Sequence, residues 1–294
     1  MKVLVTGGSG FIGSHTVHHL QHLGHDPIIL DHRGWADAID CETILGDVRD
    51  YTATSEAVAI SDGVIHLAGV LGTAETINEP LPAVETNILG SLNVFKACRH
   101  YNRPAVYIAV GNHWMNNSYS ITKTTAERFA FMFNQEHGTR IAIVRALNAY
   151  GPGQKAEPVR KIIPNFILPC LNDEPIIVYG DGAQIMDMIH VTDVADYLCR
   201  ALLMDHGVYG KVFEVGTGRA LTVNQIAQAV IDEVGTGSIE HAPMRPGEPA
   251  HSVVLADTLT LEPLGPTDFT PLEVGLKGTV NYYRHVKELT TSFV

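Results

Sequence analysis

Tyr119 and Lys123 are the side chains whose types and spacing point most directly to chemistry. They are four residues apart in a segment with a helical pattern, so one turn of helix places both on the same face. A lysine ammonium near a phenol favours the phenolate and lowers the pKa of the tyrosine. The pair predicts a group that takes the proton from a hydroxyl whose carbon loses hydride. Because such pairs are common on protein surfaces, this interpretation depends on the preceding segments.

A glycine-rich segment near the start of the chain predicts where the hydride acceptor binds. Gly7, Gly10 and Gly13 follow a short apolar strand pattern and lead into a helical one. In this motif the first glycine permits the turn, the second lets the backbone approach a pyrophosphate, and the third lets the helix pack on its strand. The helix then directs free N–H groups and the positive end of its dipole at the phosphates. We therefore expect a dinucleotide here, with further contacts from Phe11 and Ile12.

Asp31, directly after the apolar strand pattern at residues 28–30, predicts which dinucleotide is bound. A carboxylate at this point can accept hydrogen bonds from both hydroxyls of the adenosine ribose. It would repel a 2′-phosphate, so the sequence favours NAD over NADP. His32 and Arg33 follow as further expected contacts, and the charge of Arg33 weakens the preference slightly.

The third and fourth predicted strands add cofactor contacts where they end. Residues 42–45 predict the third strand, after which Asp47 can accept from an adenine amino group or cap a helix. Residues 63–69 predict the fourth strand, in which we expect His66 to be a hydrogen-bonded core residue. Small residues at its end would let the dinucleotide pass over the backbone. The contacts expected from these strand ends are Asp47, Val48, Leu67, Ala68 and Gly69.

The remaining elements alternate between helix and strand. Helical patterns cover residues 11–23, 79–101 and 118–136, and a fifth strand pattern covers 105–110. This alternation predicts an α/β protein with a doubly wound parallel sheet, the Rossmann fold. Asn87 is polar within an otherwise apolar helix, so it either shapes the site beside the cofactor or has a purely structural role.

The composition fits a globular enzyme and excludes some classes of partner. The 294 residues are 45% hydrophobic and 18% charged, and the net charge of -12 argues against nucleic-acid binding. No apolar run could span a bilayer and no signal peptide precedes the first strand, so we expect a cytoplasmic protein without membrane partners. Four separated cysteines indicate free thiols. No metal site is expected, because no carboxylate or cysteine completes a site with His15, His18, His19 and His22.

Together these motifs resemble the extended branch of the short-chain dehydrogenase/reductase family, the nucleotide-sugar epimerases and dehydratases. The resemblance covers nearly the whole chain in the expected order. Besides the glycine loop and the Tyr119/Lys123 pair, it rests on residues 46–48, 66–69, 86–90, 145–154, 189–195 and 245–248.

The resemblance implies an NAD-dependent epimerase of a nucleoside-diphosphate sugar, acting at C4 through a transient keto intermediate. Tyr119 would remove the C4 hydroxyl proton, and Lys123 would hold the nicotinamide ribose. The family also implies a division of the chain into two domains. An NAD-binding domain spans residues 1–155 with 185–217 returning to it, and a smaller α/β substrate domain comprises 156–184 and 218–294.

A homodimer is the assembly that the resemblance implies. In the family, helices corresponding to 80–102 and 118–136 form a four-helix interface. The second of these helices carries Phe129, Phe131, Met132 and Phe133, which is more apolar surface than one buried face needs.

One departure from the family pattern lies beside Tyr119. A Ser or Thr usually ends the fifth strand and hydrogen-bonds the reacting hydroxyl, but residues 110–113 contain neither. Asn112 or His113 could supply this hydrogen bond, and Ser118 and Thr73 are weaker candidates.

A second departure concerns the diphosphate. Met186 stands where the family usually has an Arg, which leaves Arg245 as the expected clamp. A second charge could come from one of three other cations, and Asn148 could bond the base or the diphosphate. The cations are Lys155, Arg160 and Lys161.

Two alternative functions stay open. A 4,6-dehydratase or decarboxylase of the same family is the first, although a dehydratase needs an Asp-Glu pair where Asn112 and His113 stand. The second is a catalytically silent nucleotide-binding protein. The missing Ser or Thr favours it, and the intact Tyr119/Lys123 pair opposes it.

Overall fold

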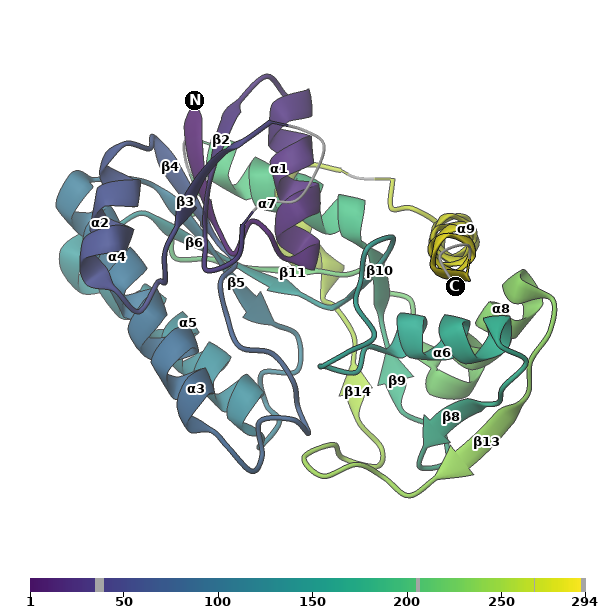
Figure 1. Ribbon diagram of the computed structural model, residues 1–294. Helices are drawn as coiled ribbons and strands as arrows, with labels where there is room; N and C mark the ends of the chain where they lie inside the picture. Colours follow the sequence, from purple (N-terminus) through teal and green to yellow (C-terminus); the bar gives the residue numbers. More distant parts are fainter. Residues whose placement is uncertain (35–39, 205–206, 267, 292–294) are drawn as a thin grey trace.

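The computed structural model describes residues 1–34, 40–204, 207–266 and 268–291. Its centre is a seven-stranded sheet in the order β11-β6-β5-β4-β1-β2-β3, with each neighbouring pair parallel (Figure 1). The strand order reverses between β1 and β4, the kind of switch point at which open α/β sheets bind ligands. This confirms the predicted doubly wound fold. The strands are β1 (Lys2–Thr6), β2 (Asp26–Asp31), β3 (Glu42–Leu45), β4 (Gly63–His66), β5 (Ala105–Val110), β6 (Ile141–Ala146) and β11 (Val212–Val215).

Helices cover both faces of the central sheet, and all six residues of β5 are buried between them. Apolar side chains of α1 and α7 form a core on one face, and those of α2, α4 and α5 form a core on the other (Figure 1). The observed α1 and α5 agree with the predicted helices to within one residue at each end. The helices are α1 (Phe11–His22), α2 (Tyr51–Ala59), α4 (Ser91–Tyr101), α5 (Ser118–His137) and α7 (Val191–Leu203).

The helix predicted at residues 79–101 is divided into three parts. The short α3 (Leu81–Ala83) leads into a π-helical segment, η1 (Val84–Gly90), which continues as α4. Asn87 lies buried in the π-helical segment, and its carbonyl oxygen accepts a hydrogen bond from Ser91 Oγ at 2.6 Å. The apolar periodicity predicted the helical character but not the wider turn.

A smaller region with its own hydrophobic core lies beside the carboxyl ends of the central strands (Figure 1). Three helices and short two- and three-stranded sheets form it, and the paired strands β7 and β10 join it to the first region because they contribute side chains to both cores. The helices are α6 (Ile162–Leu171), α8 (Val223–Val234) and α9 (Leu272–Thr291). The strands are β7 (Asn148–Tyr150), β8 (Ile176–Tyr179), β9 (Ile185–Met186), β10 (Met188–His190), β12 (Leu221–Thr222), β13 (Ile239–Ala242) and β14 (Val253–Val254).

The chain passes between the two regions at points that differ from the expected boundaries. α7 and β11 pack in the first region, but β9 pairs with β12 and β14 in the second, although residues 185–217 were expected to return together. The 3₁₀ segment η2 (Thr258–Leu264) falls within the stretch expected to form the substrate domain. Its Leu261 and Leu264 are buried in the first core, because this segment packs against β11.

Candidate functional site

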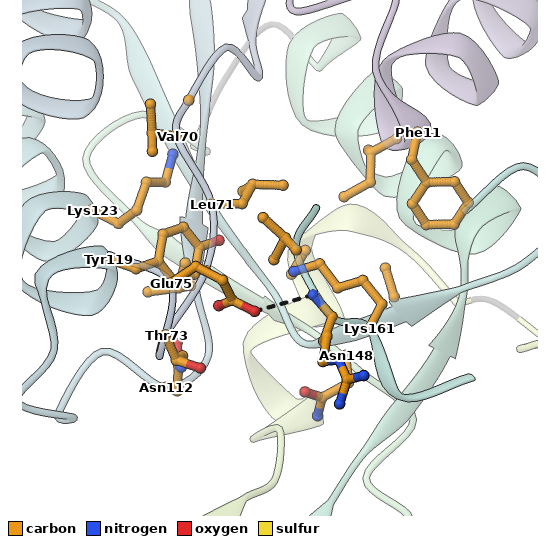
Figure 2. A pocket seen from close by; sticks show the side chains of 18 of the residues that line it. Phe11, Val70, Leu71, Thr73, Glu75, Asn112, Tyr119, Lys123, Asn148 and Lys161 are labelled. Atoms are coloured by element: carbon orange, nitrogen blue, oxygen red, sulfur yellow. Dashed lines mark hydrogen bonds between the residues drawn. The ribbon is translucent and has the colours of Figure 1, made fainter. Parts of the chain in front are cut away.

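A cavity of about 770 Å³ lies between the carboxyl ends of the central strands and the smaller region. Nearly all of the residues expected to take part in cofactor binding, substrate binding or catalysis line it. Asn87 and His113, both in the described part of the chain, are exceptions. Figure 2 shows Tyr119 and Lys123 on one side of this cavity and Lys161 and Asn148 on the other. The predicted residues in the lining are Gly7, Gly10, Phe11, Ile12, Gly13, Asp31, His32, Arg33, Asp47, Val48, Leu67, Ala68, Gly69, Thr73, Asn112, Tyr119, Lys123, Asn148, Arg160 and Arg245.

The glycine loop is packed so closely that side chains would not fit at two of its positions. Gly7 has a φ of +72°, and a Cβ there would lie 2.8 Å from the backbone nitrogen of Ala68. A Cβ on Gly13 would lie 2.7 Å from the Cα of Gly8. The N-cap of α1 is Gly10, which has no side chain to bind the first N–H groups of the helix. The loop therefore presents backbone donors to the cavity.

Asp31 is fixed at the end of β2 by backbone donors on both sides. Its carboxylate accepts hydrogen bonds from Ser9 N at 3.1 Å and from Arg33 N at 3.0 Å. The side chain is 2% exposed, and His32 Nδ1 and Arg33 Nε lie 3.3 Å and 3.7 Å from Oδ1. These contacts tie Asp31, the residue expected to bind the ribose, directly to the glycine loop.

Asp47 lines the cavity, and its Oδ2 accepts from both Nε and Nη2 of Arg49, at 3.0 Å and 2.7 Å. The Arg49 guanidinium holds the pKa of Asp47 below its usual value. The N-cap of α2 is Asp50, which accepts from the backbone nitrogens of Thr52 and Ala53. The prediction that Asp47 could cap a helix is therefore wrong, since the chain runs three residues further before α2 begins.

A buried chain of hydrogen bonds connects β1 with the helix that carries Asn87. Thr6 Oγ1 lies 2.6 Å from His66 Nδ1, and His66 Nε2 lies 2.9 Å from Ser91 Oγ. Burial lowers the pKa of His66 to about 3, so the ring is neutral. His66 is therefore a core residue with hydrogen bonds to both ring nitrogens, as the sequence indicated.

The Asn87 amide shapes the cavity wall from behind. Its Oδ1 accepts from Val70 N at 2.8 Å, and its Nδ2 donates to Val70 O and Thr122 Oγ1 at 3.0 Å each. Val70 lines the cavity, and Thr122 lies on α5 between Tyr119 and Lys123. Asn87 thus fixes the loop after β4 to the helix that carries the proposed catalytic pair, and direct contact with a dinucleotide is not indicated.

Tyr119 and Lys123 lie one turn apart on α5, and both line the cavity (Figure 2). Burial raises the pKa of Tyr119, so the expected lowering of this pKa by Lys123 is not found. The ammonium of Lys123 lies over the ring of Tyr107, 4.3 Å from its centroid. Burial also lowers the pKa of Lys123 to about 7, which Glu127 partly opposes. Desolvation therefore outweighs the attraction that the spacing suggested.

Two of the four candidates for the missing Ser or Thr, Asn112 and Thr73, line the cavity, whereas His113 and Ser118, which the structure also describes, do not. Asn112 Nδ2 lies 3.5 Å from the sulfur of Met115, a weak acceptor. His113 contributes its carbonyl oxygen, which accepts from Thr124 Oγ1 at 3.2 Å. The Thr73 hydroxyl lines the cavity but donates to Glu248 Oε1 at 2.7 Å. Of the four candidates, Asn112 has the side chain best placed to meet a ligand.

A group of charged residues lines the opposite side of the cavity. Arg245 donates to Glu248 through Nε at 3.1 Å and through Nη2, and its Nη1 lies 3.6 Å from Glu75 Oε1. The same Glu75 oxygen accepts from the backbone nitrogen of Arg160 at 3.1 Å. Burial and the charge of Arg245 lower the pKa of Lys161, whereas Glu75 and Glu248 raise it.

The sequence did not single out Glu75 or Tyr179 as members of this group. Arg160 Nη1 donates to Tyr179 OH, and the Arg245 guanidinium lies 5.3 Å from the centroid of the Tyr179 ring. These contacts join segments far apart in the chain, so local spacing could not reveal them. Met186 lines the cavity from β9, which leaves an apolar wall where the family usually has an Arg.

Comparison with known proteins assigns the family. The sequence profile of the NAD dependent epimerase/dehydratase family matches residues 3–216. The chain belongs to this family. It is therefore an NAD-dependent enzyme, as the glycine loop and Asp31 predicted.

Individual epimerases are similar to this family member along almost its whole length. A putative UDP-glucose 4-epimerase of Methanocaldococcus jannaschii is 30% identical over 96% of this chain and 98% of its own. The structure of a Thermotoga maritima UDP-glucose 4-epimerase with UDP-glucose has a TM-score of 0.90 and 28% identity, covering 98% of this chain and 100% of that one. The Thermus thermophilus UDP-glucose 4-epimerase with NAD has a TM-score of 0.87 and 26% identity, covering 97% and 99%.

The residues of this epimerase/dehydratase family member fit the cofactor that the family requires. The closely packed glycines at 7 and 13 leave the backbone of the loop open to a pyrophosphate. Asp31 would offer a carboxylate to the adenosine ribose, and Ala68 and Gly69 would offer a surface of small residues. Residues suited to the adenosine, the pyrophosphate and the nicotinamide thus all line the same cavity.

Proposed function

We propose that this protein is an NAD-dependent C4 epimerase of a nucleoside-diphosphate sugar. The observation that carries the proposal is that one cavity holds the glycine loop, the Tyr119/Lys123 pair and the cations around Arg245. A ligand with a diphosphate at Arg245 and Arg160 can direct its sugar toward Tyr119. The similar UDP-glucose 4-epimerases support this assignment.

The roles of the chain's own residues follow from their positions. NAD supplies the chemistry of taking up a hydride from the sugar carbon and returning it. Tyr119 accepts the proton of the C4 hydroxyl and returns it to that oxygen when the keto carbon takes hydride back, while Lys123 holds the cofactor ribose and its charge favours the phenolate against the opposing effect of burial. Asn112 donates a hydrogen bond to the sugar oxygen as it gains charge. Arg245, Arg160, Thr73 and Asn148 bind the nucleoside diphosphate.

The test is incubation with a panel of uridine- and thymidine-diphosphate sugars, followed by separation of the products. We expect interconversion of 4-epimers without net formation of NADH. A 4-keto-6-deoxy product or release of carbon dioxide would instead establish the dehydratase or decarboxylase alternative. Binding of NAD without turnover of any sugar in the panel would establish the silent binder.

We also propose a homodimer that forms through η1 and α5. Leu89, Ile121 and Phe131 on these segments are 52%, 51% and 36% exposed, which is unusual for large apolar side chains of neighbouring helices. Phe133 is buried in the core with Phe95, so it does not contribute to this surface. Light scattering at micromolar concentration tests the proposal, and a monomer mass would contradict it.

A cytoplasmic location is the accompanying proposal. All four cysteines are free, which suits a reducing compartment. In the described part of the chain, no helix is long and apolar enough to cross a membrane.

A further inference from the structure

A buried row of charged residues extends from Lys123 away from the cavity. Tyr119, Lys123 and Glu127 occur at four-residue intervals on α5, so they share one face of the helix. Lys123 and Glu127 are each only 3% exposed. Burial of two opposite charges one turn apart is costly unless each has partners, so the partners of Glu127 bear on the state of Lys123.

Glu127 is held by Arg145 on β6 in a bidentate pair. Arg145 Nε donates to Glu127 Oε2 at 3.0 Å, and Nη2 donates to Oε1 at 2.6 Å. The remaining nitrogen, Nη1, donates to Glu214 Oε1 on β11 at 3.1 Å. Glu214 Oε2 in turn accepts from the backbone nitrogen of Asp257 at 2.9 Å. The Glu127 carboxylate is therefore fixed in position by the strands beneath α5.

These three partners act behind the cavity wall. Lys123 lines the cavity, whereas Glu127, Arg145 and Glu214, all described, do not. They cannot touch a substrate or cofactor bound there. Their charges can therefore act on the reaction only through neighbouring groups, and Lys123, one turn from Glu127 on α5, is the neighbour that lines the cavity.

The charges around Lys123 come from several elements. Tyr119 and Glu127 share its helix, and the Tyr107 ring faces its ammonium from β5. His66 on β4 is neutral, and the charge of Lys123 helps to lower the pKa of that ring. Burial lowers the pKa of Lys123 to about 7, and Glu127 is the group that raises it. Arg145 lies behind Glu127 with a charge of the opposite sign.

We propose that Glu127 is a positioning residue that keeps Lys123 charged in the reaction, and that Arg145 limits how strongly it does so. The inference rests on the proposed function, in which the charge of Lys123 holds the cofactor ribose and favours the Tyr119 phenolate. Glu127 and Arg145 thereby set the pH above which the catalytic pair loses its positive charge.

Substitutions of Glu127 and of Arg145 are expected to shift the pH at which Lys123 loses its proton in opposite directions. In Glu127→Gln the stabilising negative charge is lost, so Lys123 releases its proton at a lower pH. In Arg145→Gln the charge of Glu127 is no longer balanced, so Lys123 keeps its proton to a higher pH. We expect shifts of about one pH unit, typical of one nearby buried charge. A purely structural role would give the two variants no such difference in sign.

The decisive experiment is a titration of Lys123 by NMR in the full-length protein with isotope-labelled lysine. The Lys123 signal is assigned from its loss in Lys123→Arg. Glu136→Gln, an exposed change near the end of the same helix, is the matched control and should leave the titration unchanged. The alkaline limb of the kcat profile should move by the same amounts, because activity is lost as Lys123 loses its proton.

Thermal unfolding shows whether each variant folds. In Glu127→Gln, Arg145 keeps Glu214 as a partner. If Glu127→Gln alone does not fold, the double variant Glu127→Gln/Arg145→Gln removes both charges of the ion pair together. The double variant should still titrate at a lower pH than the wild type. Unchanged titrations, or shifts of the same sign in Glu127→Gln and Arg145→Gln, would overturn the inference. Because the titration needs no turnover, an inactive protein with the expected shifts would refute only the proposed function.

Discussion

The two walls of the cavity are built on different physical principles. The cofactor wall consists of backbone amides, glycines and short side chains on parallel strand ends, and its one key carboxylate, on Asp31, is 2% exposed. The substrate wall consists of long charged side chains from separate segments. The side chains of Arg245 and Arg160 there are 20% and 46% exposed.

This contrast indicates how each wall should respond to a substitution. The cofactor wall is fixed by close packing and by donors that are part of the main chain, so little rearrangement is possible there. The substrate wall is held by ion pairs among its own members, which a ligand can replace. Changes on the first wall should therefore act on NAD alone, and changes on the second should act in a graded way on the nucleotide sugar.

Tyr119→Phe should affect the chemical step and not the binding of ligands to either wall. Turnover should fall by at least about 10²–10⁴-fold, the usual contribution of an acid–base group. NAD binding should stay nearly unchanged, because only a proton acceptor is removed. Product assays together with calorimetric titration of NAD measure the two effects. Appreciable turnover in this variant would remove Tyr119 from its proposed role.

Gly13→Ala tests the close packing of the cofactor wall. The added Cβ would meet the Gly8 backbone at 2.7 Å, so the loop must shift. Overpacking costs about 1–3 kcal/mol, which corresponds to roughly a fivefold to 150-fold loss of NAD affinity if the shift falls on the binding loop. Calorimetry measures it, and Gly278→Ala, with open space around the added Cβ, is the control. NAD affinity equal to that of the control would mean that the loop tolerates displacement.

Arg245→Gln tests the substrate wall. We expect UDP affinity to fall by about tenfold, the low end for a hydrogen bond to a charged group, because Arg160 and Lys161 still line the cavity. NAD affinity should not change. Titrations of each ligand at two salt concentrations make the measurement. A matching loss of NAD affinity would show that the two walls are coupled, contrary to the comparison.

Asn112→Ala should have the smallest effect of the four changes. It removes one neutral donor beside Tyr119, so kcat should fall only about several-fold, less than the tenfold loss expected in Arg245→Gln, while the substrate KM changes little. His113→Ala is the matched comparison and should be milder, because His113 does not line the cavity. Steady-state kinetics of both variants decide between the residues. A larger loss in His113→Ala would reverse this assignment.

The residues that line the proposed cofactor wall could be predicted from the sequence almost completely. Its residues come from the strand–turn–helix units of the sheet, so period and motif spacing place Gly13, Asp31 and Ala68 without knowledge of distant contacts. The position of Asn87 was predicted, but its partners Val70 and Thr122 were not. They depend on how the loop after β4 meets α5.

The substrate wall could be predicted only in part, because it is assembled from segments far apart in the chain. Arg245 lies in a recognisable motif, whereas no sequence motif marks Glu75. Its place in the site is evident only from its contacts with Arg160 and Arg245. The state of Tyr119 was also missed. Spacing shows that Lys123 is near, but it does not show how much water burial excludes from both groups.

The double pairing of Arg245 has a consequence for how a ligand enters. Its Nε and Nη2 donate to Glu248, and its Nη1 lies 3.6 Å from the carboxylate of Glu75. In the proposed function, an arriving diphosphate would therefore replace Glu75 as a partner of Arg245 and would not fill an unpaired positive pocket. The released Glu75 belongs to the segment that also bears Leu71 and Thr73, both lining the cavity. Binding of the diphosphate end of the ligand would thus affect the segment that lines the other end of the cavity, where the sugar would meet Tyr119.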